Sequence, residues 1–382
     1  MSAEERAGAG NGPEPAATRQ AAEQAYAKIN LSLDITGRRD DGYHLVSMVM
    51  QTVALCDEVT VTVRDDEKLV MTGLDLRPCA GSQAEEGEKD GQDIPAQKAG
   101  QERLSGSGQQ VYTHDGLLAF GPENLCVRAA EAFQKAYGIT AGVDIYLEKR
   151  IPVAAGLAGG SADAAAVLRA MRKLFAPEVS DEDLRRLAIG LGADIPYCIG
   201  GGTALCEGIG EEITPLPAFG PCTVVLVKPV FPISTGEAYG DYDRISAEQP
   251  GLFRRPDNAG LVQLLRTQSG DRRSVQQASA AKESQENQAF GESGTDTHFS
   301  RQWASDFSKA MGNVLRDVAV LKHPEISFLE EDLKLHGAFA SQMSGSGPTV
   351  FGLFESMEMA EEAAMAIADL PGIESSIVCC TC

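Results

Sequence analysis

The sequence KRIPVAAGLAGGSADAAAVL, residues 149–168, joins a run of very small side chains to the start of a helix pattern. It follows GVDIYLEKR, residues 142–150, whose alternating apolar residues are typical of a β-strand. A backbone with few side chains can approach a bulky ligand, and glycine accepts positive φ without strain. The start of a helix adds free N–H groups and the positive end of its dipole. The stretch therefore predicts an anion site, and a nucleotide phosphate is its natural guest.

The motifs that this loop lacks argue against two common kinds of nucleotide-binding loop. A tight strand-to-helix turn that serves only packing is the plainer alternative. No lysine follows the glycines, so the loop is not of the Walker type. The absence of G-x-G-x-x-G argues against a dinucleotide-dependent oxidoreductase. Two more loops of small residues occur at 200–202 and 344–348, and three such loops in one chain favour close approach of the backbone to a ligand.

A strand pattern near the N-terminus carries two polar side chains of interest. AYAKINLSLDI, residues 25–35, alternates apolar and polar residues with the period of a half-buried strand. Lys28 and Asn30 fall on the same face, opposite the apolar one. From the pattern alone, Lys28 reads as a solvated strand lysine. Asp194, which precedes Ile-Pro, reads as a turn residue.

Capping signals mark three helices. Asn124 predicts the N-cap of a helix that ends at Gly138. Ser180 with Asp183 predicts a capping box, and Ser161 predicts the N-cap of the helix that follows the small-residue loop. From about residue 339 onward, the pattern predicts a β-β-α-β ending of the ferredoxin-like kind.

Length and composition bound the class of protein. A chain of 382 residues is long for one domain, so two are expected. The net charge of −22 repels phosphate backbones and anionic lipid, so neither nucleic acid nor membrane is an expected partner. The nine cysteines are odd in number and lie mostly in apolar segments, which indicates reduced thiols and a cytoplasmic location. The N-terminal residues lack an apolar core of a signal peptide, and no apolar run reaches the roughly 18 residues of a membrane span.

Composition shifts divide the chain. Two internal stretches are polar and almost without large apolar residues, so they cannot bury enough surface to offset the entropy of ordering. Prolines and glycines cluster at 215–222, which predicts a domain boundary there. The predicted segments are a disordered lead at 1–22, an N-terminal domain at 23–218 with a disordered insertion at 77–110, and a C-terminal domain at 219–382 with a disordered insertion at 266–300.

Four short stretches together resemble the GHMP small-molecule kinase superfamily. They are residues 27–31 (AKINL), 152–161 (PVAAGLAGGS), 191–196 (LGADIP) and 344–348 (SGSGP), in the order that the superfamily has them. The resemblance covers about 25–240 and 303–380. It implies an α+β, two-domain GHMP kinase fold. The N-terminal domain would be a ribosomal-protein-S5-like α/β domain, the C-terminal one a ferredoxin-like α+β domain, and the active site would lie in the cleft between them.

The resemblance also implies the chemistry. ATP would be the phosphate donor, and Mg²⁺ would be held mainly by its phosphates and water, so no protein metal ligand is predicted. Asp194 would be the catalytic base, and Lys28 would lie against it and keep the carboxylate ionised. The residues implied for ATP binding are Pro152, Val153, Ala154, Ala155, Gly156, Leu157, Ala158, Gly159, Gly160 and Ser161.

Further detail resembles the branch of the superfamily whose alcohol substrate carries a cytidine diphosphate. The stretches that carry it are DDGYH at 40–44 and GEAY at 236–239. They imply ATP-dependent phosphorylation of the 2-hydroxyl of 4-diphosphocytidyl-2-C-methyl-D-erythritol, a step of non-mevalonate isoprenoid synthesis, by a monomer or homodimer. Without the resemblance, Tyr43 and His44 read equally well as a hairpin-turn pair. The residues implied for substrate binding are Asn30, Tyr43, His44, Thr235, Tyr239, Gly345, Ser346 and Gly347.

Two alternatives stay open at this point. One is another small-alcohol kinase of the superfamily, of the homoserine or mevalonate type, although those substrates have no base for Tyr43 and His44 to bind. The other is a non-catalytic metabolite-binding module on the same fold, which the presence of Lys28 and Asp194 disfavours. The chain also departs from its relatives, which usually have Gly at position 158 and often Ser at 162. Ala158 would be strained by about 1 kcal/mol if that position requires positive φ.

Overall fold

Two long antiparallel strands organise the first sheet in this computed structural model, which describes residues 19–78, 118–268 and 299–382. Strand β1 (Gln20–Arg38) pairs with β2 (His44–Val63) along nearly its whole length. The pairing register shifts between Tyr26 and Lys28 and again between Asn30 and Ser32. Irregularities of this kind bend a strand and re-aim its side chains. Here they lie on either side of the two polar residues that the sequence singled out.

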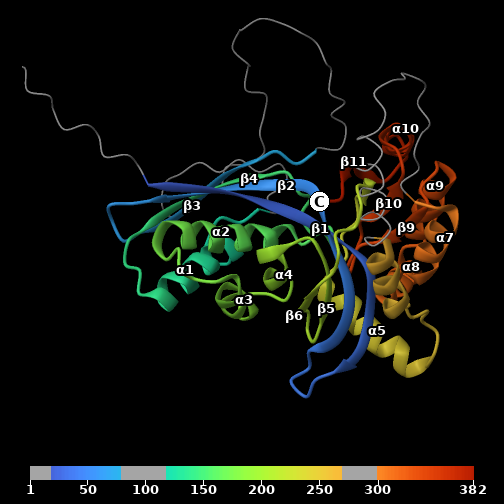
Figure 1. Cartoon of the computed structure of the whole chain (residues 1–382), viewed down its shortest axis with the longest axis horizontal. Helices are drawn as coiled ribbons and strands as arrows, with labels where there is room; N and C mark the ends of the chain where they lie inside the picture. Colours follow the sequence, from blue (N-terminus) through green and yellow to red (C-terminus); the bar gives the residue numbers. More distant parts are fainter. Residues whose placement is uncertain (1–18, 79–117, 269–298) are drawn as a thin grey trace, which may run out of the picture.

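The remaining strands extend this sheet, and helices cover one of its faces (Figure 1). The strand order is β3-β4-β2-β1-β8, with β5 paired to β2 and β6 paired to β5. The strands are β3 (Leu69–Asp75), β4 (Val143–Lys149), β5 (Thr203–Glu207), β6 (Glu212–Pro215) and β8 (Gly312–Asn313). The helices are α1 (Leu125–Tyr137), α2 (Gly159–Phe175), α3 (Asp181–Ile189) and α4 (Ile195–Gly200).

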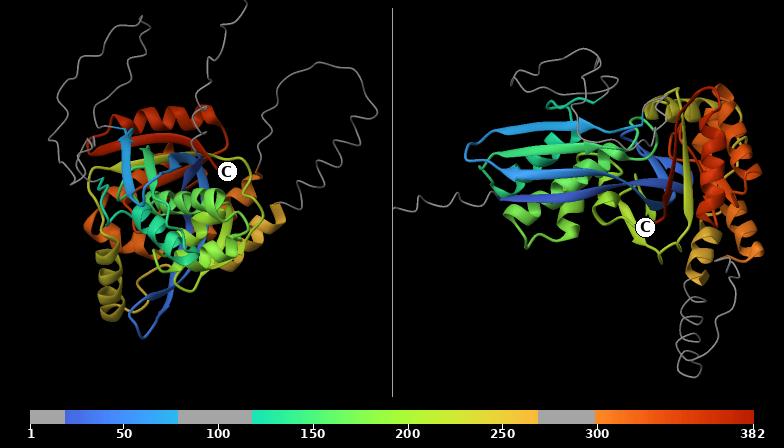
Figure 2. Two further views of the ribbon diagram at one scale, coloured as in Figure 1. Left: turned by 90° about the vertical axis from the view of Figure 1, so that its left-hand side faces the viewer. Right: turned by 90° about the horizontal axis from the view of Figure 1, so that it is seen from above.

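A second, antiparallel sheet lies beside the first, with its own helices (Figure 2). Its order is β11-β7-β10-β9, and the chain ends with the predicted β-β-α-β sequence of elements. The strands are β7 (Thr223–Pro229), β9 (Ala340–Met343), β10 (Val350–Phe354) and β11 (Ile373–Cys380). The helices are α5 (Thr235–Glu248), one over residues 258–268, α7 (Arg301–Ala310), α8 (Val314–Lys322), α9 (Glu325–Leu335) and α10 (Met357–Ala368).

The predicted helix caps are confirmed in two of three cases. The Asn124 side chain accepts from the Cys126 N–H, Gly138 ends α1 with φ +65°, and Ser180 and Asp183 form the capping box of α3. The prediction that Ser161 caps α2 is wrong. The N-cap position is Ala158, three residues earlier, because the Ala158 carbonyl already accepts from the backbone N–H of residue 162 at 2.9 Å.

The prediction of a half-buried strand at 25–35 is also wrong in its middle. Lys28 is 4% exposed and Asn30 is fully buried. The polar face is covered by residues of the second half of the chain: the Asn30 N–H donates to Ser344 Oγ at 3.3 Å. Alternation along a strand therefore identified the two faces correctly, but it could not reveal what packs on the polar one.

Most of each predicted disordered segment lies outside the described residues. These parts are residues 1–18 of the lead, 79–110 of the first insertion and 269–298 of the second. The edges of the predicted segments are ordered. Residues 20–22, placed in the lead at 1–22, belong to β1 because they pair with residues 60–62 of β2. Arg77, placed in the insertion at 77–110, is buried and forms an ion pair with Asp75. Residues 266–268 and 299–300, placed in the insertion at 266–300, are ordered as well, and 266–268 end the described part of a helix.

The division at 218/219 stays a proposal. Strand β6 ends at Pro215 in the first sheet, and β7 begins at Thr223 in the second. Within the described ranges, none of the helices has the length and apolar content that crossing a bilayer requires.

Candidate active site

A cavity of about 710 Å³ brings most of the predicted site residues together. Residues 152–161, which we call the phosphate loop, all line it. Residues 344–347, which we call the substrate loop, contribute Gly345, Ser346 and Gly347 and pack against Gly156 of the phosphate loop. Lys28, Asn30, Asp194, Thr235 and Tyr239 complete the predicted lining. Tyr43 and His44 are not among the lining residues.

Lys28 and Asp194 lie next to each other at this cavity. The Lys28 ammonium is 3.6 Å from Asp194 Oδ2, and it donates to Asn30 Oδ1 at 2.6 Å and to the Gly156 carbonyl at 3.2 Å. The Lys28 side chain is 5% exposed, whereas that of Asp194 is 30% exposed. Asp194 precedes α4 without capping it through its side chain. A fixed buried cation thus faces a carboxylate that remains accessible from the cavity.

The phosphate loop is held in an unusual backbone conformation. Ala154, Gly156 and Ala158 have φ of +51°, +75° and +56°. A Cβ at Gly156 would lie 2.2 Å from the Ser344 carbonyl oxygen, so only glycine fits there. Position 158 thus has the positive φ at which an alanine is expected to be strained.

Ala158→Gly should therefore stabilise the protein. The substitution relieves a left-handed conformation that costs an alanine about 1 kcal/mol. The higher entropy of glycine in the unfolded chain offsets part of this gain. We expect the free energy of unfolding to rise by about 0.5 kcal/mol in urea denaturation. Ala155→Gly is the matched control: this neighbour has no positive φ, and its substitution should lower the free energy of unfolding by about 0.5–1 kcal/mol. A loss of stability in Ala158→Gly would contradict the assignment of strain.

A buried ionic cluster, which the sequence analysis missed, lies at the two ends of the phosphate loop. The Lys149 ammonium, at the end of β4, donates to Asp57 and, at 2.7 Å, to Asp163 Oδ2 on α2. Asp57 Oδ1 accepts from the N–H of Ile151 at 2.8 Å. The side chains of the three charged residues are at most 4% exposed. The cluster thereby connects the strand before the loop to the helix after it.

Burial and charge act against each other in this cluster. Burial raises the pKa of Asp163 well above the ordinary carboxyl value, against the opposing effect of Lys149 and with a further increase from Asp57. For Lys149, burial favours the neutral amine, yet the carboxylates of Asp163 and Asp57 together raise its pKa above the ordinary lysine value. The lysine is therefore charged, and it is the only counter-charge bonded to two buried carboxyl groups in the described part of this cluster.

The predicted base-binding residues form a separate group at the end of the β1–β2 hairpin. His44 Nε2 is 2.7 Å from Asp243 Oδ1 on α5, and the His44 ring lies 4.7 Å from the ring of Tyr239. Tyr239 also lines the cavity, and burial, followed by the charge of Asp194, raises the pKa of its phenol. Tyr43 is 60% exposed. Asp243 was missed, although its spacing of four residues from Tyr239 puts both on one helix face.

Helix α5 also contacts the substrate loop directly. Thr235 Oγ1 and Ser346 Oγ are 2.9 Å apart. Ser234, as the N-cap, accepts from the backbone of residue 237 and leaves the Thr235 hydroxyl for this contact. Two predicted substrate residues that are more than a hundred positions apart in the sequence thus meet at the cavity.

Comparison with known proteins places this site in a family. Residues 124–202 match the GHMP kinases N terminal domain, and residues 300–370 match the GHMP kinases C terminal domain. A 4-diphosphocytidyl-2-C-methyl-D-erythritol kinase of Clostridium acetobutylicum is 36% identical over 89% of this chain and 92% of its own length. The enzyme of the same name from Clostridium beijerinckii is 37% identical over 88% and 92%.

The chain belongs to the 4-diphosphocytidyl-2-C-methyl-D-erythritol kinase family. As a GHMP kinase, it is an ATP-dependent phosphotransferase. A crystal structure of 4-(cytidine 5'-diphospho)-2C-methyl-D-erythritol kinase superimposes with a TM-score of 0.61 at 25% identity and covers 94% of this chain and 99% of its own. A homoserine kinase from Cytophaga hutchinsonii superimposes with a TM-score of 0.62 at 17% identity, covering 97% of each chain, which shows the shared fold alone. The predicted two-domain GHMP kinase fold is confirmed.

Proposed function

We propose that this chain transfers the γ-phosphate of ATP to the 2-hydroxyl of 4-diphosphocytidyl-2-C-methyl-D-erythritol. The products are the 2-phosphate and ADP, and the reaction is a step of non-mevalonate isoprenoid synthesis. The observation that carries the proposal is the 3.6 Å approach of Lys28 Nζ and Asp194 Oδ2 at the edge of a cavity lined by the phosphate loop. The family to which the chain belongs supplies the substrate.

In this proposal, Asp194 accepts the proton of the attacking hydroxyl. The carboxylate is open to the cavity, as a base that must reach a substrate has to be. The Lys28 ammonium, held by Asn30 and the Gly156 carbonyl, orients the hydroxyl and faces the charge of the transferring phosphate. Since Lys28 is anchored by three oxygens, its position costs little reorganisation during the reaction.

The phosphate loop would bind the triphosphate through its backbone. The start of α2 at Gly159 and Gly160 presents free N–H groups to the cavity. Mg²⁺ would reduce the charge of the phosphates and would be held mainly by ATP and water. Among the described residues, no group of three or more His, Cys, Asp or Glu is arranged to hold a metal ion, so we assign it no set of protein ligands.

The group of His44, Asp243 and Tyr239 would recognise the cytosine. Because the Asp243 carboxylate accepts a hydrogen at 2.7 Å, we assign the ring hydrogen of His44 to Nε2, which leaves Nδ1 as an acceptor. An acceptor matches the exocyclic amino group of cytosine. The exposed Tyr43 ring offers a flat face for the base to stack on.

Asp243→Ala tests this assignment. Losing the partner of His44 removes a charge-assisted hydrogen bond, so we expect the KM for the cytidine substrate to rise about 10-fold while kcat changes little. Asp241→Ala is the matched control: Asp241 lies on the same helix but pairs with Lys322 and Arg244, so the KM should stay within about 2-fold. Equal kinetics of both variants would exclude Asp243 from base recognition.

The proposal as a whole is tested by ADP release with three alcohols at saturating ATP. We expect release with 4-diphosphocytidyl-2-C-methyl-D-erythritol and none above background with homoserine or mevalonate, because neither rival substrate carries a base for His44 and Tyr239. Faster turnover of either rival would overturn the substrate assignment. No release with any of the three would favour a non-catalytic binding module.

Location and assembly complete the proposal. We assign the chain to the cytoplasm as a monomer or homodimer that binds neither nucleic acid nor membrane, in keeping with its net charge of −22.

A further inference from the structure

Asn313 lies where three parts of the active-site frame meet, although neither its sequence context nor the cavity lining draws attention to it. It belongs to the short strand β8, which pairs in parallel with β1 through Ser32–Gly312 and Leu33–Asn313. The strand β1 carries Lys28 and Asn30 a few residues earlier. Asn313 is 2% exposed. Because it pairs with Leu33, its backbone is fixed to the strand that carries Lys28.

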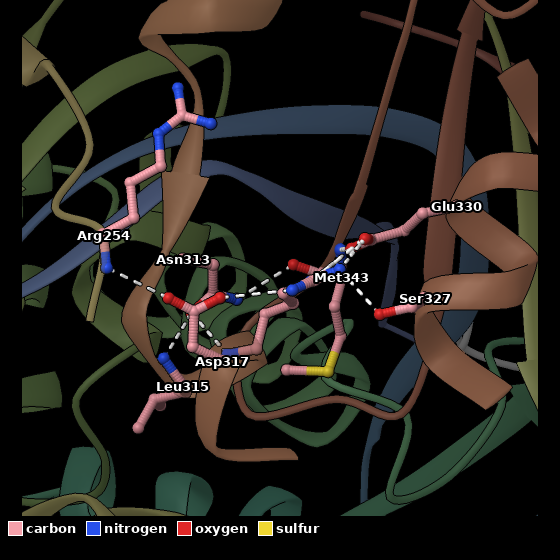
Figure 3. Close-up of polar contacts among 8 residues, drawn as sticks. Arg254, Asn313, Leu315, Asp317, Ser327, Glu330 and Met343 are labelled. Atoms are coloured by element: carbon pink, nitrogen blue, oxygen red, sulfur yellow. Dashed lines mark hydrogen bonds and ion pairs between the residues drawn. The ribbon is translucent and has the colours of Figure 1, made fainter. Parts of the chain in front are cut away.

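The side chain of Asn313 connects the start of α8 to Met343, the last residue of β9 (Figure 3), and to Gly345 of the substrate loop. Its Nδ2 donates to the carbonyls of Met343 at 2.9 Å and Gly345 at 2.8 Å. Its Oδ1 accepts from the N–H groups of Leu315 at 3.0 Å and Arg316 at 3.4 Å, at the start of α8. An amide has two donors and one oxygen that can accept twice, so every hydrogen-bonding position of Asn313 is used.

The loop that Asn313 holds packs directly against the reacting groups. A Cβ at Gly345 would lie 3.3 Å from Lys28 Nζ, 3.4 Å from Asn30 Oδ1 and 3.1 Å from the Gly156 carbonyl oxygen. The Ser344 hydroxyl donates to that same Gly156 carbonyl at 3.0 Å. A displacement of this loop would therefore shift Lys28, Asn30 and the phosphate loop together.

Two of the four residues of the substrate loop have no side chain that could fix their conformation. Gly345 and Gly347 have φ of +58° and +86°, and glycine has many alternative conformations when it is not held. The start of the loop is fixed on its other side by Glu330, whose Oε1 accepts from the Met343 N–H at 3.2 Å (Figure 3). Glu330 is itself held by Arg316, whose Nη2 donates to Oε2 at 2.6 Å. The two carbonyl contacts of Asn313 thus complete an arrangement that begins on α8 and α9.

We propose that Asn313 is a positioning residue for phosphoryl transfer. It fixes the carbonyls of Met343 and Gly345, and through the substrate loop it holds Lys28 and Asn30 where the alcohol must react. The inference rests on the proposed function, because it concerns the position of the alcohol at the same site. A shift of about 1 Å in such a group can cost a reaction roughly two orders of magnitude.

Asn313→Asp separates the two contacts of the side chain. Aspartate caps a helix as well as asparagine does, so α8 keeps its N-cap. The carboxylate cannot donate, however, and it faces two carbonyl oxygens instead. We expect kcat/KM for the cytidine substrate to fall about 10-fold to 100-fold. Asn313→Ser is a neutral second variant that also caps helices but is too short to reach both carbonyls, and the same direction of change is expected.

Hydrogen exchange provides a readout that does not depend on turnover. The N–H groups of Ser344 and Gly347 bond to the carbonyls of Thr349 and Ser344, at 2.9 Å each. We expect these two amides to exchange at least about 10-fold faster in both variants, while the amides of α8 keep their protection. Ser356→Ala, which removes the N-cap of α10 away from the cavity, should change neither the kinetics nor the exchange of this loop.

The outcomes separate the two claims. Wild-type kinetics and unchanged exchange of the loop in folded Asn313→Asp and Asn313→Ser would show that Asn313 is only a helix cap and would overturn the proposal. If the wild type released no ADP with the cytidine substrate, the proposed function would fail. Faster exchange confined to the substrate loop would then still support the assignment of Asn313 as the residue that holds it.

Discussion

Asp194→Asn is expected to lower kcat for the cytidine substrate by about 100-fold to 10,000-fold, the range over which general acid–base catalysis contributes. The amide has the same shape as the carboxylate, so it can still lie beside Lys28, which is 3.6 Å away. It cannot accept the proton of the hydroxyl. Because the substitution leaves binding contacts in place, the KM for both substrates should change little, and the loss should appear in kcat.

Asp181→Asn is the matched control for this experiment. Asp181 is a more exposed aspartate in the first turn of α3, where it pairs with Arg172 at 2.6 Å. Its kcat should stay within about 2-fold of the wild type, since exposed ion pairs contribute at most about 1 kcal/mol and this one is remote from the cavity. A coupled assay of ADP release measures both variants. If Asp194→Asn turned over as fast as Asp181→Asn, Asp194 would not be the base.

Lys149→Met is expected to lower the free energy of unfolding by about 3–5 kcal/mol, which is a large share of the stability of a typical protein. Methionine fills a similar volume but leaves Asp57 and Asp163 buried without a cation. Removing one partner of a buried pair costs more than the pair itself contributes, because the remaining charge is uncompensated. Urea denaturation of the full chain, followed by circular dichroism, measures the change.

Lys173→Met provides the comparison at the surface. Lys173 is 59% exposed and pairs with Glu23 at 2.6 Å, so its loss should cost less than about 1 kcal/mol. Equal stability of the two variants would mean that the cluster of Lys149, Asp57 and Asp163 does not stabilise the phosphate loop. We also expect Lys149→Met to weaken nucleotide binding, because the cluster connects β4 to α2 on either side of the loop.

Parts of the site whose form depends only on neighbouring residues could be predicted from the sequence. The phosphate loop was recognisable from its small side chains, whereas Ala158 drew attention because enzymes of the resembled family usually have Gly at this position. Lys28 and Asp194 came from the resemblance to a family rather than from the residues themselves, whose patterns favoured a solvated lysine and a turn. The distinction matters because the same resemblance would have been lost if the four short stretches had diverged.

The residues that were missed share a different property. Asp57 meets Lys149 across 92 positions of the sequence, and Asp243 meets His44 across 199. Asn313 contacts a loop about 30 positions away. Periodicity reports which face of an element a side chain occupies, but not which distant element covers that face. The burial of Asn30 was mispredicted for the same reason.

The two register shifts of β1 that lie nearest Lys28 and Asn30 have a consequence for how this site tolerates change. They lie on either side of Lys28 and Asn30, so the aim of both side chains depends on the number of residues between the shifts. Substitutions nearby alter chemistry one position at a time. Removing a single residue just before Lys28 would turn Lys28 and the side chains that follow it to the opposite side of the sheet and send the ammonium group into the apolar interior. In this stretch, the deletion of one residue would damage the enzyme more than a substitution would.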